Sequence, residues 1–230
     1  IAGNFLRENR WPIALLLLWI VLSAAVFGSF SKERVVVEDI VFYVRQQALY
    51  IVVFSAFLAS SAINNERKSR RILLVLSKAV SRAQYLMALL MGTLAVSFIY
   101  GLAFGACCTW LASRSALPWK GVWLMLVIVM AGSAMAAALA LFFSTFLNPF
   151  IATALTAAVI SAPSLAHADK ELWFLFLPGL PLLVNVLHFN FHDNWSVNWA
   201  AVFVALLEAL LFWALGTLVF GRRDIAVPIE

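Results

Sequence analysis

The chain has 230 residues and a formal net charge of +5, and only 12% of its residues are charged. Soluble domains carry about 25% charged residues, so this chain has too few polar side chains to cover a surface in water. The composition therefore excludes an ordinary soluble protein and indicates an integral membrane protein. No stretch has the composition of a second, soluble domain, and we expect residues 1–230 to form a single transmembrane domain.

Six apolar segments are long enough, or nearly so, to cross a bilayer as helices. A hydrocarbon core about 30 Å thick needs ~20 apolar helical residues. The predicted spans are residues 11–30, 40–63, 85–112, 121–146, 150–165 and 199–220. Asn148 and Pro149 separate the fourth span from the fifth, because proline removes a backbone donor and disfavours helix in the residue before it. The predicted fold class is an all-α integral membrane protein with six transmembrane helices.

The segment between the second and third spans, Asn64–Arg82, is the most charged part of the chain. Six of its nineteen residues are Lys or Arg, yet five consecutive aliphatic residues, Ile72–Leu76, stand in its middle. A loop that only connects two spans through water would not be expected to expose five consecutive aliphatic side chains. A short amphipathic helix that lies along the membrane, or that fills a groove on a partner, would bury these side chains. We therefore predict a short cytoplasmic helix between these two spans.

Small residues in the third and fourth spans predict close contacts between helices. Gly101 and Gly105 form a GxxxG pattern, and Ala131–Ala138 forms a small-residue face. Lipid tails do not drive apolar helices together, so the helices must gain their contact energy from close backbone approach. We expect both stretches to lie at interfaces between helices.

Residues 166–198 begin polar and then turn apolar, with Pro178, Gly179 and Pro181 interrupting the apolar run. Neither piece is long enough to span the membrane, so we expect short helices in the outer leaflet, with an ordinary structured loop as the alternative. His188 and His192 have a spacing that can place two metal ligands on one helix face. Phenylalanines flank both histidines, and we expect no metal site here; His167 is isolated.

Glu208 is the one acidic residue inside a predicted span. A charged side chain at the centre of a membrane helix costs about 2.5–3.5 kcal/mol on insertion scales. Glu208 should therefore be neutral, be paired, or face a polar cavity. Two interpretations remain open: a neutral acid hydrogen-bonded to a neighbouring helix, and a residue of a transport pathway.

The distribution of basic residues predicts the orientation. Six crossings place both termini on the side that also holds Asn64–Arg82, and that side has ten Lys and Arg residues against six on the other. Positive charge marks cytoplasmic segments, so we expect a multi-pass cell-membrane protein, in a bacterial inner membrane, with both termini in the cytoplasm. An aromatic belt is predicted near the outer face, formed by Trp110, Trp119, Trp123, Trp173, Trp195 and Trp199.

The sequence lacks several motifs that carry chemistry. It contains no GxxxxGK[ST] phosphate loop, no HExxH zinc motif and no GxSxG nucleophile elbow. A membrane enzyme would need a cluster of reactive groups, and Glu208 alone does not form one. We expect a protein that is not itself an enzyme and that binds no nucleic acid.

Two stretches resemble a known family, the ABC-2 type transporter permeases. In that family a Glu after the second span is followed by a short amphipathic helix and an LLS-x-PVSR element, and here the matching residues are Glu66, Ile72, Val75, Leu76, Ser77, Lys78, Val80, Ser81 and Arg82. The ending FGRRDI, Phe220–Ile225, is similar to the family's exit from its last span. The run LPLLVNVLHFNF is more weakly similar to permeases associated with multicopper-enzyme maturation. Ala79 stands where the family usually has proline.

The resemblance implies the membrane subunit of an ABC transporter that exports a substrate the sequence does not identify. Its coupling helix would dock on a separate cytoplasmic ATPase, which would bind ATP and Mg²⁺, and a second permease copy would complete the transporter as a homodimer. An extracytoplasmic partner could dock on residues 166–198. A free-standing secondary carrier using Glu208, or a membrane scaffold, is the alternative. The implied coupling residues are Glu66, Arg67, Arg70, Arg71, Ile72, Leu73, Leu76, Ser77 and Arg82.

Overall fold

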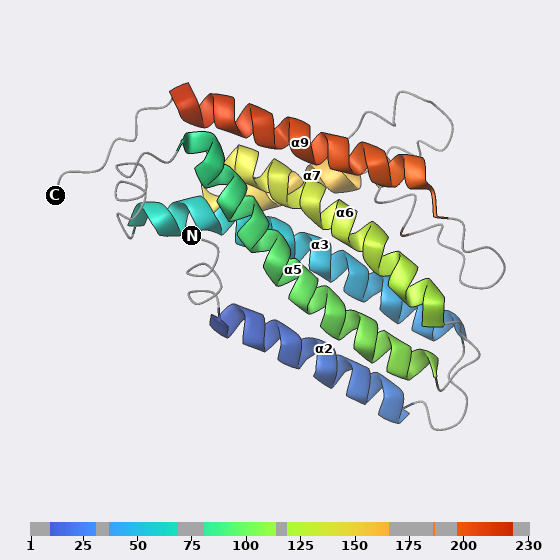
Figure 1. Ribbon diagram of the computed structural model, residues 1–230. Helices are drawn as coiled ribbons and strands as arrows, with labels where there is room; N and C mark the ends of the chain where they lie inside the picture. The colour runs from blue at the N-terminus through green and yellow to red at the C-terminus, as the bar shows by residue number, and fades with distance from the viewer. Residues whose placement is uncertain are drawn as a thin grey trace.

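The computed structural model describes residues 10–30, 37–68, 81–113, 119–165, 186 and 197–222. Within these ranges the regular structure is entirely helical (Figure 1). The helices are α2 (Arg10–Phe30), α3 (Val37–Lys68), α5 (Arg82–Ala112), α6 (Trp119–Ser144), α7 (Pro149–Leu165) and α9 (Trp199–Arg222). The predicted all-α class is therefore confirmed for the described residues.

Five of these helices, α2, α3, α5, α6 and α9, are long and apolar enough to cross a membrane. This is the architecture of a multi-pass membrane protein, because in hydrocarbon a helix satisfies its own backbone hydrogen bonds. The predicted fifth span corresponds to α7, which has 17 residues. At ~1.5 Å per residue α7 extends about 26 Å, slightly less than the ~30 Å of a bilayer core. A sixth crossing therefore stays a prediction.

Consecutive helices run in opposite directions along the bundle (Figure 1). One end of the bundle, named here the Arg82 end, holds the start of α2, α5 and α7 and the end of α3, α6 and α9. The opposite end, the Trp199 end, holds the start of α3, α6 and α9. Four of the predicted belt tryptophans, at positions 110, 119, 123 and 199, lie at or near helix ends on the Trp199 side and are exposed by 37% or more.

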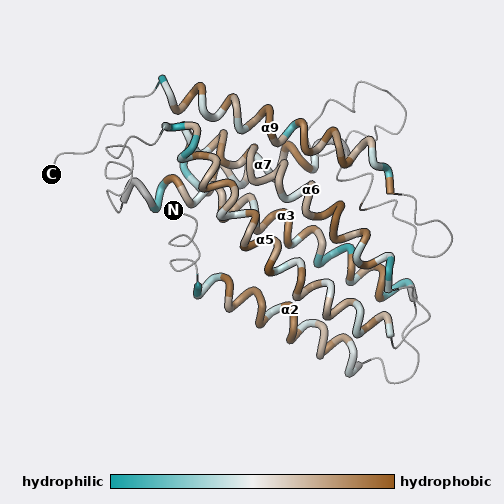
Figure 2. The backbone as a smooth tube through the Cα atoms, in the orientation of Figure 1, coloured by the Kyte–Doolittle hydropathy of each residue, from teal (hydrophilic) through white to brown (hydrophobic). Residues whose placement is uncertain are grey.

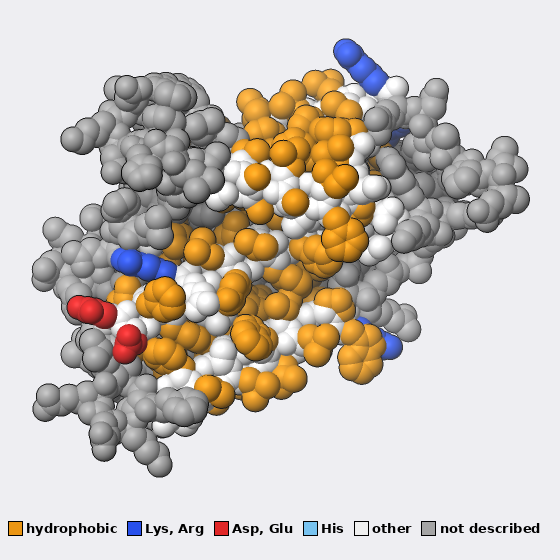
Figure 3. Space-filling view, turned by 180° about the vertical axis from the view of Figure 1, so that it is seen from behind, with side chains coloured by type: hydrophobic (Ala, Val, Ile, Leu, Met, Phe, Trp, Pro, Cys, Tyr) orange, Lys and Arg blue, Asp and Glu red, His pale blue; other side chains and the backbone are white. Residues whose placement is uncertain are grey.

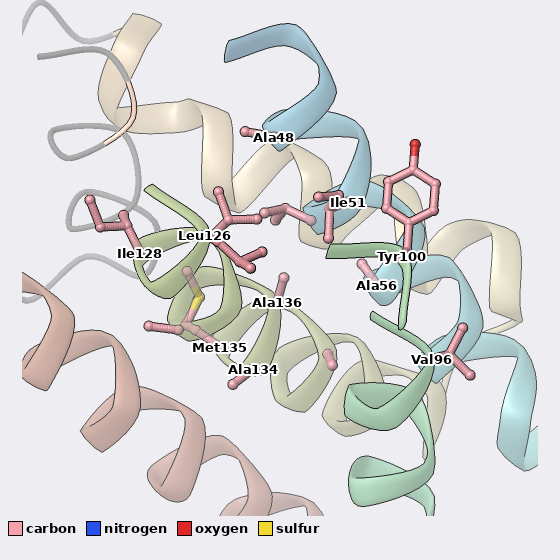
Figure 4. Close-up of a cluster of buried hydrophobic side chains, with 14 of the residues drawn as sticks. Ala48, Ile51, Ala56, Val96, Tyr100, Leu126, Ile128, Ala134, Met135 and Ala136 are labelled. Atoms are coloured by element: carbon pink, nitrogen blue, oxygen red, sulfur yellow. The ribbon is translucent and has the colours of Figure 1, made fainter. Parts of the chain in front are cut away.

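Helix α6 is the centre of the bundle and packs against α3, α5, α7 and α9. Every residue from Ala131 to Leu141 is buried. A helix that is buried all round must be apolar on all faces, and the small side chains of this stretch let several neighbours approach at once. Ala131–Ala138 was expected to form one contact face, but its neighbours enclose it on all sides. In Figure 4 Ala136 points towards Ile51 of α3, whereas Ala134 and Met135 lie on the opposite side of α6.

The GxxxG pattern of α5 lies against α6. A Cβ atom added to Gly101 would come 2.6 Å from Cδ1 of Leu126, and one added to Gly105 would come 3.2 Å from the ring of Trp123. These separations are too short for a larger side chain without movement of the neighbour. The predicted close helix contact is confirmed, and the structure identifies α6 as the partner.

The outer helices α2 and α9 present wide apolar surfaces. Only 17% of the most apolar window of α2 and 22% of that of α9 are buried, against 83% for α6. Exposed side chains include Leu18 on α2 and Phe203 and Leu210 on α9. The tube in Figure 2 is hydrophobic along most of each helix, and the charged side chains visible in Figure 3 lie at the edges of the apolar surface. Such a surface suits lipid rather than water.

Candidate functional site

The start of α5 is set by a local motif. Ser81 precedes the helix, and its Oγ accepts a hydrogen bond of 3.2 Å from the backbone N–H of Gln84. Gln84 Oε1 in turn accepts a bond of 3.1 Å from the backbone N–H of Ser81. This reciprocal pair is a capping box, which satisfies backbone donors that a helix start leaves open. It places Arg82 in the first turn of α5, at the Arg82 end of the bundle.

Arg82 binds the end of α9, 138 residues further along the chain. Its Nη1 donates hydrogen bonds to the carbonyl oxygens of Phe220, at 2.8 Å, and Gly221, at 2.7 Å. The last carbonyls of a helix have no partner within the helix, and the negative end of the helix dipole attracts a cation. Arg82 therefore acts as a side-chain cap for α9.

Aromatic packing supports the same contact. The guanidinium carbon of Arg82 lies 6.0 Å from the ring centre of Phe220. Tyr85, one turn along α5, stacks on Phe220 with ring centres 6.1 Å apart. Both aromatic side chains are completely buried. The first turn of α5 and the last turns of α9 are thus packed together around the two hydrogen bonds from Arg82. We call this contact the α5–α9 junction.

For the other predicted coupling residues, the structure describes either the backbone alone or neither backbone nor side chain. Helix α3 continues to Lys68, so the backbone of Glu66 and Arg67 is helical, but their side chains are not described. Six further residues lie outside the described ranges: Arg70, Arg71, Ile72, Leu73, Leu76 and Ser77. What the structure does place is the two ends of Asn64–Arg82, and both lie at the Arg82 end of the bundle.

Glu208 lies near the middle of α9, between the buried residues Ala205 and Ala209. Both of its carboxyl oxygens are buried, and neither forms a hydrogen bond within the part of the chain that the structure describes. The hydrogen bond to a neighbouring helix, which one of the two interpretations of Glu208 requires, is not formed among the described residues, so that interpretation stays a prediction. A buried carboxyl that has no hydrogen-bond partner in the described part of the chain is in an unfavourable position in an apolar environment, which keeps Glu208 a candidate functional residue.

A buried polar cluster was not predicted from the sequence. Gln47 of α3 donates from Nε2 to Ser23 Oγ of α2, at 3.3 Å, and its Oε1 accepts from the Tyr100 hydroxyl of α5, at 3.3 Å. Ser23 and the Tyr43 hydroxyl share a further hydrogen bond of 2.9 Å. We call these four residues the Gln47 cluster. Its signal in the sequence was an amide residue inside an apolar span.

The Gln47 cluster joins three helices in the interior of the bundle. The side chains of Gln47 and Tyr100 are each only 2% exposed. Hydrogen bonds between membrane helices contribute about 0.6 kcal/mol each on average. Helix α2 is otherwise the least enclosed long helix and packs against α5, so these bonds add a link from α2 to α3. The role of the Gln47 cluster in holding the helices together is enough to explain its hydrogen bonds.

The histidine-rich region, His167, His188, His192 and Asp193, lies outside the described residues. Among the residues that are described, no three His, Cys, Asp or Glu side chains come together in a group that could hold a metal ion. In comparisons with known proteins, no family model, no curated protein and no solved structure matches this chain.

Proposed function

We propose that the chain is the membrane-spanning permease subunit of an ABC transporter, which couples ATP hydrolysis by a separate ATPase to the export of a substrate. One observation carries the proposal. The two stretches that resemble ABC-2 permeases, Asn64–Arg82 and Phe220–Ile225, are far apart in the sequence, yet Arg82 of the first binds Phe220 and Gly221 at the second. A functional unit made of these two stretches requires such proximity.

The proposed arrangement has six crossings, with α7 as a short one. A hydrophobic helix slightly shorter than the bilayer core is accommodated by local thinning of the bilayer at modest cost. The Arg82 end then faces the cytoplasm, together with Arg10 and Arg222. Lys and Arg are in excess on the cytoplasmic side of membrane proteins, and this is the side from which a cytoplasmic ATPase can reach Asn64–Arg82.

In this function the chain supplies the docking segment and the passage, and the ATPase supplies the chemistry. ATP and Mg²⁺ bind to the ATPase, because this sequence has no phosphate loop of its own. The aliphatic residues Ile72–Leu76 fill an apolar groove of the ATPase, as an amphipathic helix does. A second permease copy pairs with this one to enclose the passage.

Copurification tests the proposal. The tagged chain, purified in mild detergent from the cells that make it, is expected to bring down a protein with a phosphate-loop ATPase sequence. Replacing Leu73 and Leu76 by Asp should abolish that copurification while membrane insertion is retained, because a charged side chain does not enter an apolar groove. Replacing the same two residues by Met is the matched control and should keep the ATPase bound. Full ATPase binding by the Asp variant would overturn the coupling role.

A secondary carrier is the second candidate, and the enclosed carboxyl of Glu208 is the observation that favours it. Intramembrane acidic residues mark ion and proton pathways in transporters. A carrier would copurify with no ATPase, and reconstituted vesicles would show uptake driven by an ion gradient without ATP. Loss of that uptake in Glu208→Gln, with normal assembly, would assign the pathway to Glu208.

A further inference from the structure

We propose that Arg82 is a positioning residue that makes α9 follow the movement of the first turn of α5. The mechanical link is a property of this chain alone, while its use in transport rests on the function proposed above. The link consists of two hydrogen bonds from one guanidinium nitrogen, Nη1, to the carbonyl oxygens of Phe220 and Gly221.

The position of the link decides what it can transmit. Contacts between α5 and α9 lie close to the Arg82 end, where Tyr85 stacks on Phe220 and the side chain of Leu86 reaches Gly216. Towards the Trp199 end the two helices diverge (Figure 1). A displacement of the start of α5 is therefore delivered to the last turns of α9, which also packs on α6.

Helix α9 is suited to such a movement because so little of it is enclosed. Half of its 24 residues are exposed, and Phe203, Leu210 and Leu218 are exposed by 55% or more. Its main packing partner is α6. At this contact Gly216 of α9 lies against Phe142 of α6. Lipid yields to a moving apolar helix more readily than packed protein does. Glu208 lies on this helix, so the link connects Asn64–Arg82 to the one enclosed carboxyl of the predicted spans.

A simple end cap would stabilise α9 in the same way but transmit nothing, and the two roles can be separated. Spin labels on cysteines replacing Leu15 of α2 and Leu218 of α9 report the distance between the outermost helices of the bundle. The background has both native cysteines, Cys107 and Cys108, changed to serine. Both positions are exposed. The test variant is Arg82→Met, which keeps an apolar stem against Phe220 but has no donor. Arg82→Lys keeps charge and donors, and Arg10→Met is the matched control at the same end.

In the isolated chain in lipid nanodiscs, Arg82→Met should broaden the Leu15–Leu218 distance distribution. Loss of charge-assisted hydrogen bonds should raise the population with a detached α9 end by roughly 10- to 100-fold. Arg82→Lys and Arg10→Met should keep the distribution of the wild-type chain. A distribution unchanged by Arg82→Met would overturn the link whether or not an ATPase partner exists.

The transmission is tested in the complex with the copurified ATPase, trapped with a non-hydrolysable ATP analogue. In the wild-type complex the analogue should shift the Leu15–Leu218 distance. Because the Arg82 guanidinium is bound to the end of α9, we assign it to positioning and not to ATPase docking, so the Arg82→Met complex should still form. That complex should still shift a second label pair, on Leu15 and Met91 of α5, while the α9 shift is lost. An α9 shift that survives Arg82→Met would reduce Arg82 to an end cap. A broadened distribution in the isolated chain without any ATPase partner would leave the link standing and remove the proposed function.

Discussion

Replacing Glu208 by leucine should make the protein more stable. Both carboxyl oxygens are enclosed, and neither has a hydrogen-bond partner in the described residues. A buried polar group that lacks its hydrogen bond costs about 1–3 kcal/mol. Leucine has a similar volume and no polar atom, so Glu208→Leu removes that cost without opening a large cavity. We expect the free energy of unfolding to rise by about 1–2 kcal/mol, the lower part of this range, because part of the side chain is exposed.

The measurement is reversible unfolding in mixed detergent micelles, with titrated sodium dodecyl sulfate and helical circular dichroism as the signal. Thr217→Leu is the matched control on the same helix. The hydroxyl of Thr217 already donates to the carbonyl of Ala214, at 2.7 Å, so its replacement should change stability by less than about 0.5 kcal/mol. A loss of stability of about 1 kcal/mol or more in Glu208→Leu would refute the reasoning, since it would mean that the carboxyl has a partner.

A functional assay separates two explanations for an unpartnered Glu208 carboxyl: a residue that only packs, and a residue that takes part in transport. A residue kept for packing can be replaced without loss of activity, whereas a strained functional residue shows gained stability together with lost function. Glu208→Gln keeps the shape of the side chain and should preserve assembly and transport-linked ATPase stimulation if Glu208 is a neutral acid. A Glu208→Gln complex that assembles fully but shows no substrate-dependent activity would place Glu208 in the transport pathway.

Three further predictions concern the bundle and its topology. Gln47→Leu should lower the free energy of unfolding by about 1–2 kcal/mol, and a double-mutant cycle with Tyr100→Phe should give a coupling of about 0.6 kcal/mol; additive effects would show that their hydrogen bond contributes nothing. Gly105→Leu should cost about 1–3 kcal/mol by overpacking the α5–α6 contact, seen as a lower unfolding midpoint; an unchanged midpoint would contradict the close approach. Cysteines replacing Lys170 and Asn194, with the native cysteines changed to serine, should both react with an impermeant reagent from outside; reaction of either from the cytoplasmic side would mean a further crossing.

The sequence by itself determined the class of protein and most of the helix bounds. Hydrocarbon offers no hydrogen-bond partners to the backbone, so a long apolar segment in lipid has to form a helix, and its length can be read directly. The start of α5 at Arg82 differs from the predicted start at residue 85, although its cause is local: Ser81 and Gln84 form a capping box within one turn. Gly101 and Gly105 predicted a close contact for the same reason: the absence of a side chain is visible in the sequence, although the neighbour is not.

The tertiary structure alone decided which helices meet and which polar groups find partners. Arg82 and Phe220 are joined by a hydrogen bond although they are 138 residues apart. Gln47 of α3 belongs to a cluster only because the fold brings Ser23 of α2 and Tyr100 of α5 within hydrogen-bonding distance of it. Glu208 shows the reverse: the sequence suggested a partner, and the packing provides none in the described residues. In a membrane bundle nearly every face is apolar, so hydropathy hardly distinguishes one neighbour from another. The choice of neighbour depends on side-chain shape and on a few hydrogen bonds, which act only over contact distances.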